Sequence, residues 1–344
     1  MPAALLIYNP TAGSAAGPEM WLGACVHRLC TEGGYEVTTV STTASTTHDN
    51  LLEGLNRDFD IIVAAGGDGT VRMVIHALAS QGLETKLGIV PLGTGNLLAR
   101  NLKIFEENLL SDPVDIALDV ILNGEALKID LGIMNGNYFA AAAGVGPLSD
   151  AIVTPGKADK ENWKMLAYAG SMVQTLAQAP VIFKVTADGE EFRVSASGIF
   201  ITNIADLGVG MLSESASMHD GLLDLCILAP KEFGDYLKYG FHFATGLSPN
   251  ITGNTAPYYI KKIKEVDIEV VPRRRPLSFL EQGYHKIKYA LTGQTDGRSK
   301  QNQGLAMIDG DACGMTPMHI KAVPNAVQMI VPTAAQLQKR SWLK

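Results

Sequence analysis

The chain has 344 residues, of which 47% are hydrophobic and 18% are charged, a composition typical of a folded protein long enough for two domains. Its formal net charge of −7 argues against nucleic acid as the main partner. No apolar run approaches the roughly 20 residues of a membrane-spanning helix. Residues 3–8 are too short for a secretory signal, so we expect a cytoplasmic protein.

The first 60 residues predict two strands separated by a helix. Apolar residues 3–8 predict a buried strand, which ends in the loop Asn9-Pro-Thr-Ala-Gly13. A helix is expected over residues 21–31 and a second strand over residues 35–40. The hydroxyl-rich run that follows, at residues 41–47, predicts a loop and a helix N-cap, then a short helix through Leu55.

Residues 60–78 predict a strand, a glycine turn and a helix. The apolar run 61–65 is typical of a buried parallel strand, and the apolar residues between 71 and 78 recur with helical spacing. The turn between them, Gly66-Gly-Asp-Gly-Thr70, exposes backbone N–H groups and the positive end of a helix, an arrangement that binds phosphate. A carboxylate inside such a turn, at Asp68, repels phosphate unless a divalent cation lies between them or the carboxylate takes a proton. The sequence therefore indicates a nucleotide bound with Mg²⁺.

A second turn of this kind follows the strand expected at residues 87–91. It reads Leu92-Gly-Thr-Gly-Asn96 and leads into another helix. Neither turn has the G-x-G-x-x-G spacing of a dinucleotide site or the G-K-[ST] ending of a P-loop. Each alone could be an ordinary strand-to-helix turn, but turns at the ends of adjacent parallel strands face one crevice. The order of the elements predicts a doubly wound α/β nucleotide-binding domain.

The second half of the chain shows the alternating pattern of half-exposed antiparallel strands. Residues 114–121 and 126–130 alternate apolar with polar side chains, and Asn135-Gly-Asn137 predicts a hairpin turn. Further strands are expected at residues 181–187, 192–202 and 222–228. We therefore expect a C-terminal antiparallel β-sandwich domain, with a cleft between the two domains. A helix over residues 159–178 could face the core or form the wall of a lipid pocket.

The expected domain boundaries follow from these patterns. The α/β domain comprises residues 1–125 together with a returning segment at about 325–344, and the β-sandwich domain comprises residues 126–324. Two carboxylates of the second domain have ordinary explanations on the residues alone. Asp130 ends a strand, where a surface carboxylate is expected, and Asp220 precedes glycine in a turn.

Three motifs together resemble the diacylglycerol kinase catalytic-domain family, which includes bacterial soluble lipid kinases and the sphingosine and ceramide kinases. They are G-G-D-G-T at residues 66–70, P-L-G-T-G-N at residues 91–96 and D-G-D at residues 309–311. The first motif is shared with the related NAD kinases, whereas the other two favour the lipid kinases. The resemblance implies an ATP-dependent enzyme that transfers the γ-phosphate of ATP to a hydroxyl group of a membrane lipid such as diacylglycerol, with Mg²⁺ as a cofactor.

The resemblance also implies which residues form the site. The residues that it assigns to ATP are Asn9, Pro10, Thr11, Ala12, Gly13, Thr43, Gly66, Gly67, Asp68, Gly69, Thr70, Val71, Arg72, Gly93, Thr94 and Asn96. It assigns Asp68 and Asp130 to Mg²⁺ through water. It also implies a structural Mg²⁺ bound by the Asp220 carboxylate and by the backbone carbonyls of Ser217 and Leu222. The catalytic residues are Asp68, Asp309 and Asp311. Because Asp311 stands where the family usually has glutamate, either Asp311 or Asp309 could take the proton of the acceptor hydroxyl.

One segment, at about 272–304, departs from the family as an insertion. Residues 261–300 contain 10 Lys and Arg against 5 Asp and Glu, a local charge of +5. The segment could be a solvated loop, or it could dock onto anionic lipid headgroups at a membrane surface, at roughly 1 kcal/mol per basic residue. We expect transient membrane contact, and the sequence leaves the lipid and a homodimer open.

Two other functions stay open. The first is a kinase of the NAD kinase type, which acts on a soluble substrate. The second is a non-catalytic regulator that binds nucleotide or lipid, in which the change to Asp311 has cost activity.

Overall fold

The computed structural model describes residues 1–13, 18–53, 55, 58–105, 112–149, 180–207, 212–229, 258–271 and 303–341. The helix expected at residues 159–178 therefore lies outside the described residues. The same holds for nearly all of the basic insertion, of which only residues 303 and 304 are described.

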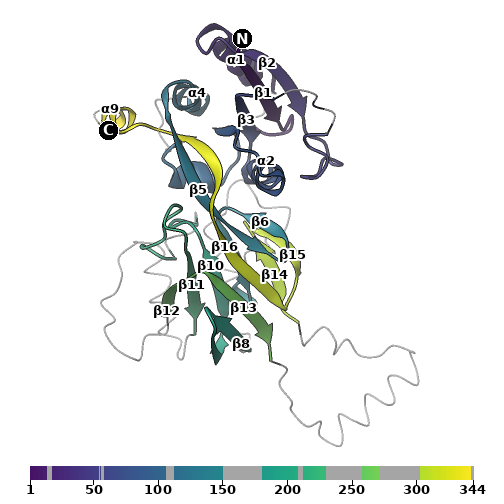
Figure 1. Cartoon of the computed structure of the whole chain (residues 1–344), viewed down its shortest axis with the longest axis vertical. Coiled ribbons are helices and arrows are strands. Elements are labelled where there is room, and N and C mark those ends of the chain that lie inside the picture. The colour runs from purple at the N-terminus through teal and green to yellow at the C-terminus, as the bar shows by residue number, and fades with distance from the viewer. Residues whose placement is uncertain are drawn as a thin grey trace, which may run out of the picture.

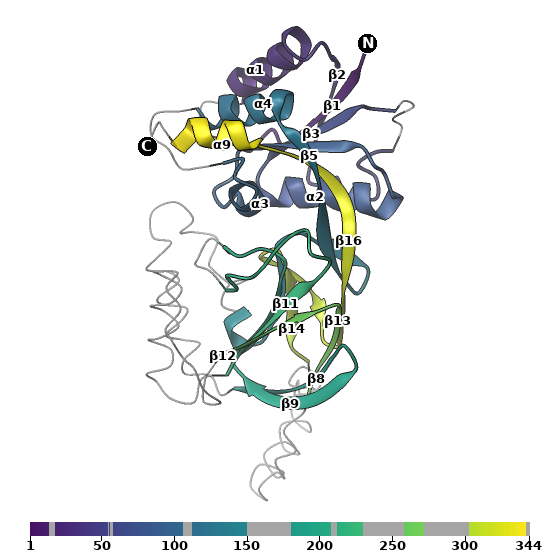
Figure 2. The ribbon, with the colours of Figure 1, turned by 60° about the vertical axis from the view of Figure 1, so that its left-hand side comes forward.

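The first domain is built on parallel strands that follow one another in the order β2–β1–β3–β4. These strands are β1 (Ala3–Tyr8), β2 (Glu36–Ser41), β3 (Ile61–Gly66) and β4 (Lys86–Pro91). Helices α1 (Pro18–Thr31) and α4 (Pro113–Asn123) lie on one face, and α2 (Asp68–Gln81) and α3 (Leu97–Asn101) lie on the other (Figure 2). Because both faces are covered, β3 is buried along its whole length. The prediction of a doubly wound α/β domain is confirmed.

The second domain consists of two antiparallel layers that share a core. The smaller sheet has the strand order β12–β11–β10–β7–β14–β15, and the other layer contains β13, β8 and β9. Buried side chains from both layers, among them Phe183, Ile201, Leu225 and Ile268, pack in one cluster. The predicted antiparallel β-sandwich is confirmed. The strands are β6 (Asn137–Phe139), β7 (Ala142–Val145), β8 (Val181–Ala187), β9 (Glu190–Ala196), β10 (Gly198–Thr202), β11 (Leu223–Leu228), β12 (Tyr258–Ile263), β13 (Glu265–Val270), β14 (Leu305–Ile308) and β15 (Asp311–Met315).

Two long strands connect the domains. β5 (Glu125–Met134) and β16 (Met318–Val331) pair antiparallel along most of their length. At one end β16 lies beside β4, and at the other it pairs with β13, so a single ten-stranded sheet runs through both domains. Figure 1 shows this connection as the yellow and blue strands between the upper and lower parts of the molecule. The chain then ends in α9 (Ala334–Ser341).

The strand predicted at residues 114–121 is wrong, because these residues form helix α4. Asp112 caps this helix by accepting a hydrogen bond from the Val114 N–H group at 2.9 Å, and Pro113 occupies its first position. The side chains of Val114, Ala117 and Ile121 are buried at helical spacing.

Two smaller predictions also differ from the structure. The single strand expected at residues 192–202 is divided at Ser197 into β9 and β10. Residues 48–53 form successive turns, where a short helix was expected. The hairpin turn predicted at residues 135–137 is confirmed, because Asn135 and Gly136 have positive φ angles. Asp188 and Gly189, between β8 and β9, form a second turn with positive φ angles.

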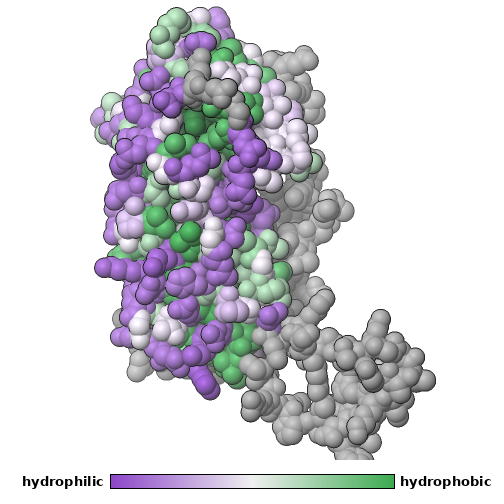
Figure 3. All heavy atoms as spheres, turned by 45° about the vertical axis from the view of Figure 1, so that its right-hand side comes forward, coloured by the Kyte–Doolittle hydropathy of each residue, from purple (hydrophilic) through white to green (hydrophobic). Residues whose placement is uncertain are grey.

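The described surface is mixed in character. Figure 3 shows hydrophilic side chains over most of the described part of one face, with smaller hydrophobic areas scattered among them. None of the helices within the described ranges has both the length and the apolar composition that a bilayer span requires.

Candidate active site

The two glycine turns pack directly against each other at the carboxyl ends of β3 and β4. A Cβ atom added to Gly93 would lie 2.6 Å from the Cα atom of Gly67, so the two backbones leave no room for a side chain. Asn96 has a left-handed backbone with φ of 49°, and its side chain bonds both the N–H and the C=O group of Gly93, at 2.9 and 2.7 Å. The two turns therefore form one unit.

Asp68, in the first glycine turn, bonds the start of helix α3, which follows the second glycine turn. Its Oδ2 atom accepts a hydrogen bond from the Asn96 N–H group at 2.9 Å, and its Oδ1 atom accepts one from the Leu97 N–H group at 2.6 Å. Asp68 thereby satisfies N–H groups at the start of α3. Burial raises the pKa of the Asp68 carboxyl group, and the backbone hydrogen bonds oppose this rise. A carboxylate has about four lone-pair sites, so Asp68 can accept further bonds.

The loop at residues 9–13 lies beside both turns. The Asn9 N–H group bonds the carbonyl of Ala65 at 3.0 Å, and the Gly13 N–H group bonds the carbonyl of Leu92 at 3.2 Å. The Asn9 side chain also accepts hydrogen bonds from the N–H and hydroxyl groups of Thr11. The structure therefore brings together the three backbone segments that were assigned to the nucleotide.

Two threonines assigned to the nucleotide lie in exposed positions near these segments. Thr43 follows β2, and its hydroxyl group contacts those of Ser45 and Thr46 at 2.9 and 3.2 Å. The neighbouring Thr42 bonds the carbonyl of Tyr8, at the end of β1. Thr94 is exposed at the tip of the second turn.

A pocket lies between the two domains and contains carboxylates from both. The first domain contributes α2 and α3, and the second contributes the two residues between β6 and β7 and the turn after β14. The pocket is lined by Asp68, Val71, Arg72, Ile75, Leu97, Leu98, Ala140, Ala141 and Asp309. Two residues separated by 241 positions in the sequence, Asp68 and Asp309, thus face one space.

Asp309 is held by backbone N–H groups in the turn between β14 and β15. Its Oδ1 atom accepts hydrogen bonds from Ala141 at 2.9 Å and Ala142 at 3.0 Å, and its Oδ2 atom accepts one from Ala140 at 3.1 Å. Its backbone is left-handed, with φ of 47°. Burial raises the pKa of Asp309, against the effect of these three hydrogen bonds and of the Arg72 charge. The hydrogen bonds fix the carboxylate firmly in place.

Asp311 has a different environment from Asp309, although only Gly310 separates them. Its side chain is 65% exposed, and its Oδ2 atom lies 2.8 Å from Nη2 of Arg72. The Nη1 atom of Arg72 also donates to the carbonyl of Ile308 at 3.0 Å. One arginine from α2 therefore orients the turn that carries both carboxylates.

Asp130 holds together a turn and strand β16. The Asp130 side chain is buried, and its oxygens accept hydrogen bonds from the N–H groups of Gly221 at 2.7 Å and Asn325 at 2.8 Å. Its own N–H group bonds the carbonyl of Met218 at 2.6 Å. Asp130 does not line the pocket that contains Asp68, so its described contacts are those of a brace between β5, a turn and β16.

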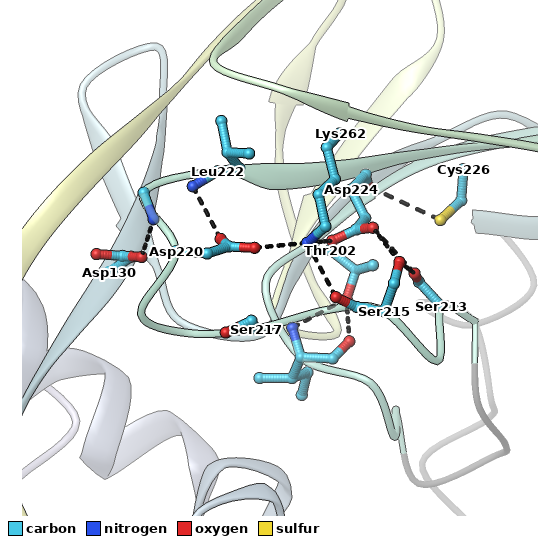
Figure 4. A network of polar contacts seen from close by, with 12 residues as sticks. Asp130, Thr202, Ser213, Ser215, Ser217, Asp220, Leu222, Asp224, Cys226 and Lys262 are labelled. Atoms are coloured by element: carbon cyan, nitrogen blue, oxygen red, sulfur yellow. Dashed lines mark hydrogen bonds and ion pairs between the residues drawn. The ribbon is translucent and has the colours of Figure 1, made fainter.

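The other residues assigned to Mg²⁺ lie in the turn before β11. The Asp220 carboxylate accepts a hydrogen bond from the Leu222 N–H group at 3.1 Å and one from the Lys262 ammonium group at 2.6 Å (Figure 4). The Ser217 hydroxyl group lies 3.4 Å from Nδ1 of His219. Within the described ranges, no three His, Cys, Asp or Glu side chains gather closely enough to hold a metal ion.

Comparisons with known proteins identify the same two domains. The family model described as the diacylglycerol kinase catalytic domain matches residues 3–134. The one described as the YegS C-terminal NAD kinase beta sandwich-like domain matches residues 142–239. A diacylglycerol kinase of Bacillus subtilis (strain 168) is 33% identical over 242 residues, which cover 69% of this chain and 77% of that protein. One of Staphylococcus aureus (strain JH9) is 31% identical over 233 residues, covering 65% of this chain and 70% of that protein.

The fold is shared with a solved structure over nearly the full length. The crystal structure of a diacylglycerol kinase from Bacillus anthracis str. Sterne superposes with a TM-score of 0.72 at 20% sequence identity. The superposition covers 97% of this chain and 98% of that one.

Proposed function

The chain belongs to the diacylglycerol kinase catalytic-domain family and is a lipid kinase. We propose that it transfers the γ-phosphate of ATP to a hydroxyl group of a membrane lipid such as diacylglycerol. The observation that carries this proposal is the pocket between the domains. It places Asp68, from a glycine turn suited to phosphate, and Asp309, from the second domain, around one space. Asp311 lies beside this pocket, where it pairs with the lining residue Arg72. Phosphoryl transfer depends mainly on positioning and on charge neutralisation, which such an arrangement can supply.

The nucleotide binds, in this proposal, where the three backbone segments meet. The N–H groups at the start of α2 and the loop at residues 9–13 hold the phosphates, with Thr43 and Thr94 near the rest of the nucleotide. The absence of side chains at Gly67 and Gly69 lets an anion approach the backbone closely. The contacts that join residues 9–13 to β3 and β4 support this assignment.

Asp68 fits a role in holding Mg²⁺. It lines the pocket and keeps lone pairs beyond the two hydrogen bonds that it accepts. When bound there, Mg²⁺ would offset the charge that develops on the phosphate oxygens. With the ion bound, the repulsion between the Asp68 carboxylate and a bound polyphosphate would be offset.

Asp311 is the residue that we assign as the base. In the reaction the lipid O–H bond breaks, a bond forms between the lipid oxygen and the γ-phosphorus, and the bond to the β-phosphate breaks to release ADP. The proton passes to the carboxylate of Asp311, which is accessible and oriented by Arg72. Asp309 fixes the turn through three N–H groups, so its oxygens are less available.

The test is a panel assay with [γ-³²P]ATP and wild-type protein. Mixed micelles would contain diacylglycerol, phosphatidylglycerol or a sphingoid base, and NAD⁺ would be offered separately because the second-domain match is described as NAD kinase-like. We expect label in a lipid and none in NADP⁺. Label in NADP⁺ alone would favour the soluble-substrate kinase, and ATP binding without transfer would favour the regulator. We propose that the protein is cytoplasmic. Because its acceptor is a membrane lipid, it must contact a membrane surface at least transiently.

A further inference from the structure

A lysine ammonium group lies inside an acidic cluster at the turn before β11. The Nζ atom of Lys262, on β12, donates to Oδ2 of Asp220 at 2.6 Å and to the carbonyl of Ser215 at 2.9 Å. It also lies 3.5 Å from Oδ2 of Asp224. Figure 4 shows the ammonium group between the two carboxylates. The adjacent Lys261 points elsewhere and pairs with Glu190.

Asp224 makes this ammonium group necessary to the fold. Its side chain is only 1% exposed, and its Oδ1 atom accepts hydrogen bonds from the hydroxyl groups of Ser213 and Ser215, each at 3.0 Å. An opposite charge nearby stabilises a buried carboxylate. Asp224 and Lys262 are direct partners in the pairing of β11 with β12, so the sheet itself delivers that charge.

The same cluster contains the carboxylate at which the family resemblance implies a structural Mg²⁺. Asp220 was assigned to that ion with Ser217 and Leu222. In the structure one Asp220 oxygen accepts the Leu222 N–H group and the other accepts the Lys262 ammonium group. A divalent cation on Asp220 would meet a positive charge already bound there, so these residues do not fit the ion while Lys262 is charged.

We propose that the Lys262 ammonium group replaces the structural divalent cation in this chain and holds the Asp220 turn without metal. The turn matters because the Gly221 N–H group, next to Asp220, bonds Asp130. Asp130 in turn bonds Asn325 of β16, the strand that connects the two domains. Lys262 therefore stabilises the junction between the domains through a chain of direct contacts.

The experiment compares thermal unfolding of wild type, Lys262→Met and Lys261→Met without nucleotide or lipid. Each protein is measured in EDTA and then with millimolar Mg²⁺ at matched ionic strength. We expect the wild-type Tm to be the same in both conditions. Lys262→Met should unfold about 5 °C or more lower in EDTA and regain much of that loss with Mg²⁺, since its two carboxylates are then free for a divalent ion. Lys261→Met should behave like wild type.

Two results would overturn the proposal: a wild-type Tm that falls when EDTA removes bound metal, or a Lys262→Met variant that unfolds like wild type and ignores Mg²⁺. If Lys262→Met does not fold in EDTA, its refolding with and without Mg²⁺ gives the same decision, because recovery is expected only with the ion. Lys262→Arg keeps a positive charge and should stay independent of Mg²⁺. The assay contains no ATP or lipid. In the proposed function Mg²⁺ binds at Asp68 together with ATP, so the result does not depend on that site.

Discussion

Asp309 and Asp311 show how two carboxylates separated by one glycine acquire different roles. Asp309 accepts three backbone N–H groups, whereas Asp311 is exposed and contacts a single arginine. The sequence could present both as candidate bases but could not rank them. The contacts that rank them come from Arg72 and residues 140–142, which lie far away in the chain.

Replacing Asp311 tests its assignment as the base. Asp311→Asn should lower kcat for lipid phosphorylation by about 10²- to 10⁴-fold while the affinity for ATP is retained, because the substitution removes the proton acceptor and keeps the size of the side chain. Asp311→Glu should keep most of the activity. Steady-state kinetics together with nucleotide-binding titration measure both effects. Full activity in Asp311→Asn, with activity lost in Asp309→Asn, would transfer the role to Asp309.

At the scale of elements, the glycine turns were predictable because their signal is local. Glycine spacing next to an apolar run indicates a strand, a turn and a helix within about 20 residues. The same kind of local signal was missed at α4, where Asp112 and Pro113 form a helix N-cap and first position. The alternation of residues 114–121 suggested a strand, but their burial follows helical spacing. The Asp-Pro start could have resolved the ambiguity.

Two glycine-to-alanine variants distinguish glycines needed for packing of the turns from glycines needed for ATP to approach the backbone. Gly93→Ala should lower the Tm, because its Cβ would meet the Gly67 backbone at 2.6 Å. Gly69 lies in α2 with no atom within 4 Å of an added Cβ, so Gly69→Ala should leave the Tm unchanged or higher. Its affinity for ATP should nevertheless fall at least tenfold, since the Cβ obstructs the approach of phosphate. Unchanged ATP binding in Gly69→Ala would show that phosphate does not approach this turn.

A buried histidine on α2 predicts a loss of stability in mild acid. His76 stacks on His48 at a ring separation of 3.6 Å and contacts Tyr138 edge-on at 5.3 Å. Burial lowers the pKa of His76 below its usual value of about 6.5, and the charges of His48 and Arg72 lower it further. The charge of Asp49 opposes this shift. The unfolded chain therefore binds the proton more readily, so stability falls as the pH drops below about 6.5.

His76→Phe keeps the ring and removes the titrating group. Urea unfolding at pH 7.5 and pH 5.5 should show a smaller loss of stability in this variant than in wild type. His27→Gln, which changes an exposed histidine on α1, serves as the control and should lose as much stability as wild type. Equal losses in His76→Phe and wild type would rule out His76 as the cause.

At the scale of the whole molecule, the sequence predicted two domains and a cleft, but the way in which they are joined was not predictable. The ten-stranded sheet depends on the pairing of β16 with β4, β5 and β13, residues that are up to about 240 positions apart in the chain. Likewise, the bonds of Arg72 to Asp311 and of Lys262 to Asp220 link separate elements. A pattern read along one chain contains no signal for such pairs.

Asp130 is the residue on which the junction between the domains depends most clearly. Asp130→Ala would leave the partly buried N–H groups of Gly221 and Asn325 without their acceptor, so we expect a loss of about 1–3 kcal/mol in the free energy of unfolding. Urea denaturation measures this loss. Asp267→Ala, at an exposed position paired with His319, should cost under 1 kcal/mol. Similar values for the two variants would argue against the brace.

The most direct test of the account is transfer of label from [γ-³²P]ATP to the best lipid of the panel, with Asp68→Ala from the first domain and Asp311→Ala from the second measured beside wild type. If the pocket between the domains is the reaction site, wild type labels the lipid and each variant is slower by at least about 100-fold. Transfer at the wild-type rate in either variant, or no transfer by a wild-type protein that binds ATP, would contradict the account.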